Sequence, residues 1–366
     1  MSGTASSVLV TGHHGHYVSQ SGLVGILKHI RQHGIPEHFS RRTVKRAREA
    51  ALPAMTPLGP LWGEVEVEMI KGPNKKFPLV NPMALLWYLT TECSGFSKVF
   101  KEAMHNHPCS IDRKWHIAIY SDEILPGNAL KATNQRKLIA FYWTVTEFGE
   151  RCSDEDYWLH ITTVRSSEVK LMKSGVAQLF KKVVEAFFVY PYSITDGVQL
   201  RVGDESVIWF GQMAVIIGDE VALKQSLSFK GAAGSIPCPL CRNVTQWSSG
   251  LANHDPTSRL IFHTEVDTAK MVQHSANSIA EAMNLLKHQK GVLTKSAFET
   301  LEQSLGLSYQ PEGALFCPQF HSHFEFGPLA SLQFDWMHCF LVGGSMNHEI
   351  GYLMESLASY PFSFLA

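Results

Sequence analysis

The sequence predicts a mixed α/β protein, built on a sheet whose elements follow the order β-β-β-α-β along the chain. Two apolar runs that each lead into an aspartate mark the first and last strands, 115–121 before Asp122 and 207–218 before Asp219. Two stretches of alternating apolar residues and one helical pattern lie between them. Because 45% of the residues are hydrophobic, the chain can also bury a substantial core.

The elements expected before this sheet are a leader, a helical head and a linker. Residues 1–19 predict a flexible leader, and residues 20–50 predict a basic head with two short helices. Residues 51–110 are rich in proline and predict a linker with one strand at 62–70, followed by a packing helix at 83–103.

The head gathers positive charge. Between Lys28 and Arg48 there are seven Lys or Arg residues and one acid, Glu37. The second helix of such a pair can enter a groove of DNA or follow its phosphates. The residues expected to contact nucleic acid are Arg41, Arg42, Lys45, Arg46 and Arg48. The alternative is a solvated basic face on an ordinary helical pair.

The central sheet is expected to begin at Trp115. After the first strand, a turn is predicted through Pro126-Gly127. Alternating apolar side chains predict the second and third strands at 137–145 and 157–164, and helical spacing predicts a helix over 168–189.

The remaining elements of the sheet follow this helix. The fourth strand, 207–218, could include a hairpin at Gly211, because 199–203 also has an extended pattern. A helix is expected over 220–229, and a short strand over 331–334.

Whole-chain properties narrow the class of protein. No apolar stretch approaches the 18 residues of a membrane span, and the first residues lack the basic start and apolar core of a secretory signal. Seven cysteines, an odd number, suit a reducing compartment better than a disulfide framework. The expected location is inside the cell, nuclear or cytoplasmic. With a net charge of −1, a nucleic-acid surface must come from local asymmetry of charge.

The two strand-ending aspartates predict a metal site. Two carboxylates about 4 Å apart repel each other by roughly 4 kcal/mol at an effective dielectric constant of about 20, so a cation would stabilise the pair. Mg²⁺ prefers hard oxygen ligands, and two such ions can clamp the attacking and leaving oxygens of a phosphoryl displacement. The alternative is that Asp122 and Asp219 only end strands in polar turns.

Two further motifs lie downstream. Cys238-Pro-Leu-Cys241 is a knuckle-type C-x-x-C that predicts structural zinc, with two unpaired thiols as the alternative. Asp335 and His338, spaced i and i+3, can face the same side of a helical turn and add a ligand or orient a water; the alternative is an N-cap aspartate near a histidine. The remaining zinc ligands stay open among His254, His263, Cys317, His321, His323 and His338.

Together these motifs resemble the transposases of cut-and-paste elements in the CACTA (En/Spm-like) and Plavaka/KDZ-type group, over residues 115–345. The resemblance rests on Tyr120-Ser-Asp122 with Pro126-Gly-Asn128, on Gly218-Asp219, on Cys238-x-x-Cys241 and on Asp335-x-x-His338.

The resemblance implies a fold and a set of cofactors. The fold is an RNase H-like domain over 111–345, with five strands ordered 3-2-1-4-5, flanking helices and a Cys-x-x-Cys insertion at 230–330. Mg²⁺ or Mn²⁺ would be held by Asp122 and Asp219, and structural Zn²⁺ by Cys238 and Cys241. Asp335 and His338 would support the catalytic site.

The resemblance also implies a substrate and partners. Transposon-end DNA would be cleaved by hydrolysis and then joined by strand transfer. Self-association into a homo-oligomer is a further expectation, and no membrane is involved.

The chain departs from that group at the third acid, which usually lies well downstream of the D-x-x-H. A C-terminal helix is expected over 346–366, and it carries two late candidates, Glu349 and Glu355, of which Glu355 is the expected catalytic acid. The abrupt apolar ending, Tyr360–Ala366, suggests a truncated or decayed copy, so enzymatic activity is left open.

Two other functions compete with this one. The first is a non-catalytic, zinc-containing nucleic-acid-binding protein that uses the basic head and the zinc knuckle. The second is a large intracellular α/β protein in which Asp122 and Asp219 lie far apart.

Overall fold

The computed structural model describes residues 55–125, 137–189, 191–257, 259–317, 331–335 and 345–359, together with Lys28, Arg31, Met337 and Cys339. The chain divides into two units, residues 1–54 with 125–136, and residues 55–124 with 137–366. All of the strands and helices named below belong to the second unit. Several sequence predictions lie outside the described residues: the contacts of Arg41, Arg42, Lys45, Arg46 and Arg48, the turn at Pro126-Gly127, and His338.

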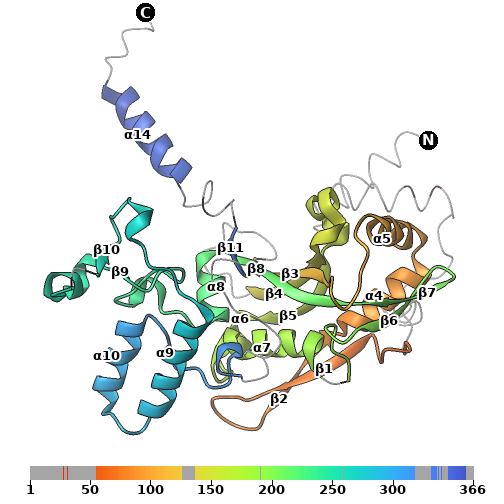
Figure 1. The fold of residues 1–366 in the computed structure, drawn as a ribbon, viewed down its shortest axis with the longest axis horizontal. Helices are drawn as coiled ribbons and strands as arrows, with labels where there is room; N and C mark the ends of the chain where they lie inside the picture. The colour runs from red at the N-terminus through yellow and green to blue at the C-terminus, as the bar shows by residue number, and fades with distance from the viewer. Residues whose placement is uncertain are drawn as a thin grey trace, which may run out of the picture. The chain divides into compact units, whose positions relative to one another are not determined.

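A five-stranded mixed sheet forms the centre of the fold (Figure 1). β3 pairs antiparallel with β4 and parallel with β8, and β8 pairs parallel with β11. The mixed α/β class predicted from the sequence is therefore confirmed. The strands are β3 (Trp115–Ile124), β4 (Leu138–Val145), β5 (Leu159–Arg165), β8 (Gly211–Gly218) and β11 (Leu332–Phe334), in the spatial order β11-β8-β3-β4-β5.

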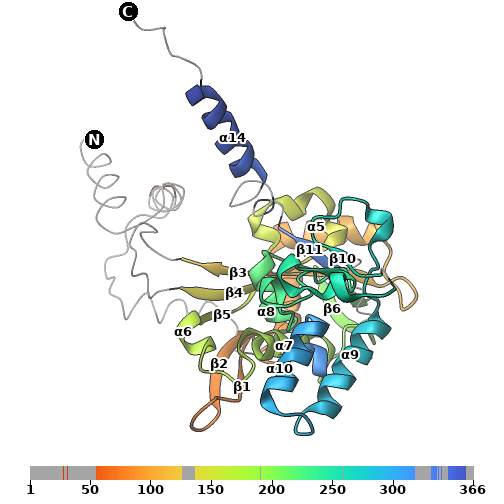
Figure 2. The same cartoon turned by 90° about the vertical axis from the view of Figure 1, so that its left-hand side faces the viewer.

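One face of this sheet, the inner face, packs against α7 (Gly175–Phe188), which lies below the strands in both views (Figure 1 and Figure 2). Phe141 stacks on Phe180 with ring centroids 6.1 Å apart, and Trp143 meets the edge of Phe187 at 5.1 Å. All four rings are fully buried. Large aromatic side chains at helical spacing on α7 thus fill the space above β4.

The opposite face, the outer face, is less covered. Along β3, Ile117 and Ile119 are fully buried on the inner face, whereas His116, Tyr120 and Asp122 are only partly buried. This period of two follows from the pleat of a strand, which sends successive side chains to opposite faces. The outer face therefore offers polar and aromatic groups next to the sheet.

β3 is longer than expected. The sequence predicted a strand over 115–121 that ends before Asp122, but β3 runs to Ile124 because Asp122, Glu123 and Ile124 still pair with β4. Asp122 thus lies within the strand, at the point where its pairing with β8 stops.

The segment expected to be a linker forms an antiparallel hairpin. β1 (Trp62–Val67) ends before the predicted limit at Ile70 and pairs with β2 (Lys75–Val80), a strand that the sequence did not predict. Pro78 in β2 obscured its pattern, because proline cannot donate a ladder hydrogen bond.

The helix expected over 83–103 is two helices, α4 (Pro82–Glu92) and α5 (Ser94–Asn106). Cys93 between them is extended, with φ −104° and ψ 95°. The following Ser94-Gly95 favours helix poorly. The break lets Leu86 of α4 and Phe100 of α5 both reach the core.

The helix expected over 168–189 begins later. A short helix, α6 (Ser166–Val169), comes first, and α7 starts only at Gly175. Ser174 and Gly175 have φ values of 56° and 50°, in the left-handed region, which interrupts a right-handed helix.

The fourth predicted strand is divided between two sheets. β7 (Glu205–Trp209) pairs with β6 (Val198–Val202), while β8 joins the main sheet. The hairpin turns at Gly203, where φ is 61°, and not at Gly211. The next helix, α8 (Glu220–Ser226), is three residues shorter than the predicted 220–229.

The remaining part of the chain adds small elements and helices around this core. Ile279, Leu286 and Phe298 bring two of the helices into the same hydrophobic cluster as the sheet. In the described residues, no helix is long and apolar enough to cross a membrane. The elements are η2 (Thr146–Ser153), β9 (Val244–Thr245), β10 (Ile261–Phe262), α9 (Ala276–Gln289), α10 (Lys295–Leu305) and α14 (Ser345–Ser359).

Glu147 of η2 ties this segment to the start of β3. Its two oxygens accept from the backbone N–H of His116 at 3.0 and 3.1 Å, and its Oε1 lies 2.8 Å from His116 Nδ1. The Glu147 side chain is only 10% exposed. A buried carboxylate with several donors is a strong local anchor.

Replacing Glu147 with Ala should lower the free energy of unfolding by about 1–3 kcal/mol, because it leaves the His116 donors without an acceptor. Urea unfolding measures this change. The matched control is Glu150→Ala, which alters an exposed glutamate of the same segment and should shift stability by less than about 0.5 kcal/mol. Equal unfolding midpoints for the two variants would show that the anchor contributes nothing.

Candidate functional site

Three aspartates lie at the same end of three adjacent parallel strands, Asp122 within β3, and Asp219 and Asp335 directly after β8 and β11. Ser121 of β3 pairs with Gly218 of β8, and Gly218 pairs with Phe334 of β11. The next residues along these strands are Asp122, Asp219 and Asp335. Neighbouring strands lie roughly 5 Å apart, so the register brings the aspartate pair predicted from the sequence to one edge of the sheet, with Asp335 beside it.

Tyr120 connects β3 with the end of β11, the two strands on either side of β8. It lies two residues before Asp122 and therefore on the same face of β3. Its hydroxyl donates to Asp335 Oδ2 at 3.3 Å, which spans the width of β8. Burial, followed by the negative charges of Asp122 and then Asp335, raises the pKa of Tyr120 well above its usual range. The hydroxyl is thus held in its protonated, donating form.

Sequence reasoning did not assign a role to Tyr120. The signal that could have found it is the spacing of two residues from Asp122 within one strand, which places both side chains on one face. Its bond to Asp335, 215 residues away, could not be read from the sequence.

Asp219 and Asp335 also have local structural roles. Asp219 is the N-cap of α8, where its Oδ1 accepts from the backbone N–H of Ala222 at 2.6 Å. Asp335 Oδ1 accepts from Met337 N at 2.9 Å, while its own N–H donates to Gly218 O at 2.9 Å. The capping role weighed from the sequence for Asp335 is therefore present, and Asp219 has one that was not predicted from the sequence. They are compatible with a metal role for Asp219, whose Oδ2 takes no part in the cap.

Gly218 permits this close arrangement. A Cβ atom there would lie 3.1 Å from Ser121 O and 3.2 Å from Ala222 Cβ. Both distances are tighter than ordinary contacts between carbon and a neighbouring heavy atom. A larger residue would push α8 and its N-cap, Asp219, away from β3.

The donor atoms at this edge suit a hard cation. Carboxylate oxygens are the ligands that Mg²⁺ and Mn²⁺ prefer. Within the described ranges, no group of three or more His, Cys, Asp or Glu side chains is arranged to hold a metal. Mg²⁺ is usually bound through one or two carboxylates, with water and substrate phosphate completing its shell.

The late acids are on a different element. Glu349 and Glu355 lie on α14 and are exposed. No hydrogen bond or ion pair between described residues connects them to the three aspartates. Glu355 therefore stays a prediction as the third acid.

Cys238 affects the ionisation of Cys241 within the C-x-x-C. Burial, and then the charge and hydrogen bond of Cys238, raise the pKa of Cys241 to about 11. Cys241 pairs with Gln273 across an isolated bridge, and His274 N donates to Leu240 O at 2.8 Å. The knuckle is thus held against the segment 272–274.

The described candidates for the remaining zinc ligands form no metal-holding group with this knuckle. His254 and His263 are exposed, and Cys317 is buried in the main core; His321, His323 and His338 lie outside the described residues. The histidine nearest in backbone pairing is His274, which sequence reasoning missed. Burial, and then the charge of Arg242, lower its pKa to about 4, so it is neutral near pH 7.

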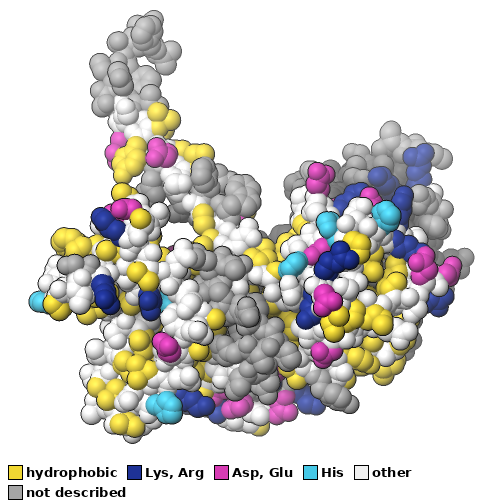
Figure 3. Space-filling view, viewed as in Figure 1, with side chains coloured by type: hydrophobic (Ala, Val, Ile, Leu, Met, Phe, Trp, Pro, Cys, Tyr) yellow, Lys and Arg dark blue, Asp and Glu magenta, His cyan; other side chains and the backbone are white. Residues whose placement is uncertain are grey.

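Charges on the viewed surface are mixed. Figure 3 shows Lys and Arg interspersed with Asp and Glu on the described part of this face. This agrees with the nearly neutral net charge of −1. On the viewed face, strong attraction for a polyanion would have to come from a small local group of cations.

No model of a known protein family matches the sequence, and no curated protein matches it either. The family resemblance drawn from the motifs therefore stays a hypothesis.

The pKa of Cys241 predicts the reactivity of the knuckle. In metal-free protein, carbamidomethylation of Cys241 at pH 8 should be far slower than that of exposed Cys339, because only about 0.1% of a thiol with a pKa near 11 is ionised at that pH. Its rate should rise steadily up to pH 11. Peptide mapping by mass spectrometry measures both rates in one sample, and equal rates at pH 8 would contradict the assignment.

Proposed function

We propose that this chain is an RNase H-like DDE-type transposase, or a remnant of one, that binds transposon-end DNA and cleaves phosphodiester bonds with Mg²⁺ or Mn²⁺. The observation that carries the proposal is the register of β3, β8 and β11, which aligns Asp122, Asp219 and Asp335 at one sheet edge.

The strand order supports the same proposal. When the strands of the main sheet are numbered along the chain, the spatial order β11-β8-β3-β4-β5 becomes 5-4-1-2-3, or 3-2-1-4-5 from the other edge. This is the order that the resemblance implies for an RNase H-like domain. Fold alone does not define an activity, so the aspartates carry the functional part of the argument.

The residues at this end of the sheet would have different roles. Asp122 and Asp219 would hold the cation. The hydrogen bond by which Asp219 caps α8 fixes the orientation of its carboxylate. A bound Mg²⁺ supplies Lewis acidity and lowers the pKa of a coordinated water. Tyr120 holds Asp335 through its hydroxyl, which keeps that carboxylate in place beside the pair. The phosphodiester to be cleaved would lie against the exposed side of these groups.

Other parts of the chain complete the proposal. Arg41, Arg42, Lys45, Arg46 and Arg48 of the head would contact DNA phosphates, and Cys238 and Cys241 would hold structural zinc. Glu355 on α14, with Glu349 as the alternative, would supply the third acid, supported by His338. Such a protein would act in the nucleus and could work as a homo-oligomer.

A second function would depend on the knuckle and not on the aspartates. A non-catalytic, zinc-containing protein that binds nucleic acid would need the Cys238–Cys241 pair and the basic head. The packing of the knuckle against the segment 272–274 is the observation that supports it.

A cleavage assay with terminal-repeat DNA and Mg²⁺ tests the proposed activity. Asp122→Asn and Asp219→Asn should each reduce cleavage by at least about 100-fold, since each removes a charged metal ligand. The matched control is Asp204→Asn, which changes a fully exposed aspartate in a turn and should retain full activity.

The same variants separate the two functions. Salt-dependent DNA binding with one bound zinc, no cleavage, and no effect of either aspartate substitution would favour the non-catalytic protein. Reversing the charge of Arg41, Arg42, Lys45 and Arg46 should abolish DNA binding under either function. Cleavage that is unchanged in both Asp→Asn variants would contradict the transposase proposal.

A further inference from the structure

β1 has an edge that is only partly used. Within the described residues, β1 belongs to a sheet of two strands and pairs only with β2. Asn81 N donates to Leu61 O at 3.0 Å, which makes the pair just before β1 a hydrogen-bonded one. Bonded and non-bonded pairs alternate in an antiparallel ladder. The N–H and C=O groups of Glu64 and Glu66 therefore point away from β2.

Two observations in β2 agree with this register. Pro78 lies opposite Glu64, at a position where no N–H is needed toward β1. Its carbonyl accepts from Thr162 Oγ1 at 2.7 Å, so that carbonyl faces β5 and not β1.

Just after β1, at Glu68 and Ile70, the backbone groups on this edge are bonded to other residues of the same chain. Lys173 N donates to Glu68 O at 2.9 Å, and Ile70 N donates to Leu171 O at 2.8 Å. The side-chain amide of Gln178 also accepts from Glu68 N and donates to Glu68 O, as a peptide group of a neighbouring strand would. The same edge at Glu64 and Glu66 has no such partner among the described residues.

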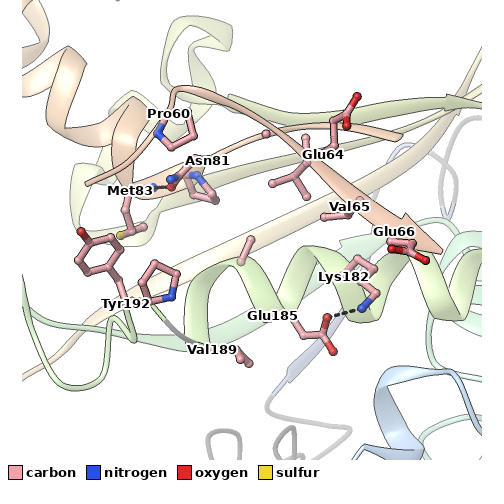
Figure 4. A pocket seen from close by; sticks show the side chains of 15 residues that line it. Pro60, Glu64, Val65, Glu66, Asn81, Met83, Lys182, Glu185, Val189 and Tyr192 are labelled. Carbon is pink, nitrogen blue, oxygen red and sulfur yellow. Dashed lines mark hydrogen bonds and ion pairs between the residues drawn. The ribbon is translucent and has the colours of Figure 1, made fainter. Parts of the chain in front are cut away.

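A cavity of about 440 Å³ lies along this empty part of the edge (Figure 4). β1 passes over α7 there, so the cavity has a strand edge on one side and the end of a helix on the other. Its apolar surface includes Val65, Met83, Ala186 and Val189.

We propose that this groove, defined by Gly63–Glu66 and the C-terminal part of α7, binds an extended peptide segment of a partner protein as an added strand on β1. Main-chain hydrogen bonds to an exposed edge supply affinity in this mode, and alternate side-chain contacts supply specificity. The proposal is independent of the function proposed for the aspartates.

The charges indicate the chemistry of the partner. Glu64 and Glu66 are exposed on the solvent side of β1, while Val65 between them faces the core side. Among the described residues, the cation paired with Glu64 is a distant one, Lys76 Nζ at 3.7 Å. Opposite charges on adjacent strands attract, so the bound segment should place Lys or Arg beside the two glutamates and apolar residues between them.

A second copy of the chain is a poorer occupant. If two β1 edges paired with each other, their glutamates would meet like charges, which destabilises a strand pair. Charged residues on an edge strand act in this way against self-association.

The experiment uses the full chain and an end-blocked, fluorescent pentapeptide of alternating lysine and valine at about 150 mM salt, where long-range attraction is screened. Fluorescence anisotropy should show saturable binding, and a glutamate–valine peptide of the same length should not bind. Glu64→Lys combined with Glu66→Lys should weaken binding at least about tenfold, because two attractive pairs become repulsive. The matched control is Glu281→Lys combined with Glu299→Lys, which makes the same charge change at exposed sites of α9 and α10. This control should leave peptide binding unchanged.

Peptides methylated on alternate backbone nitrogens test the strand geometry directly. In an antiparallel arrangement, methylation of the lysine nitrogens should abolish binding and methylation of the valine nitrogens should not; a parallel arrangement gives the reverse. The proposal is overturned if no saturable binding occurs up to about 1 mM peptide, or if both methylated peptides bind equally. A dimer of the chain that depends on this edge would assign the groove to a second copy and overturn it as well.

Discussion

The parallel register of β3, β8 and β11 is the constraint on which the proposed site depends. Ser121, Gly218 and Phe334 are level across three strands, so the residue after each one reaches the same edge. A shift of one residue in any strand would turn its aspartate to the inner face, because side chains alternate along a strand. Gly218 secures this register, since it admits both the backbone of β3 and the first turn of α8 at contact distance.

The packing of the inner face fixes which side chains remain for function. Phe180 and Phe187 of α7 fill the space above β4, and that burial requires the odd-numbered positions of β3 to face α7. Tyr120 and Asp122 are then left on the outer face. Burial, and then the negative charges of Asp122 and Asp335 on this face, raise the pKa of Tyr120. Such a concentration of carboxylates costs stability unless a cation or a donor compensates for it.

The sequence predicted what local patterns encode. Alternation of apolar residues located β3, β4, β5 and β11 within a few positions, and it placed Asp219 directly after β8. Interruptions that depend on a single backbone angle were missed, such as the left-handed Ser174 before α7. Contacts between distant segments were also missed. The bond from Tyr120 to Asp335 and the pairing of His274 with the knuckle arise only when the sheet and the insertion have folded.

Hydrogen bonding also separates the roles of the three aspartates in the proposed mechanism. Both oxygens of Asp335 already accept hydrogen bonds, Oδ2 from Tyr120 and Oδ1 from Met337 N. Among the described residues, Asp219 accepts a side-chain hydrogen bond through Oδ1, in the cap of α8. A cation that bound Asp335 would compete with these two donors, whereas a cation at Asp219 could use an oxygen that is not engaged in the cap. In the proposed site, hydrogen bonding therefore favours Asp219 over Asp335 as a ligand, with Asp335 as the carboxylate that Tyr120 holds beside it.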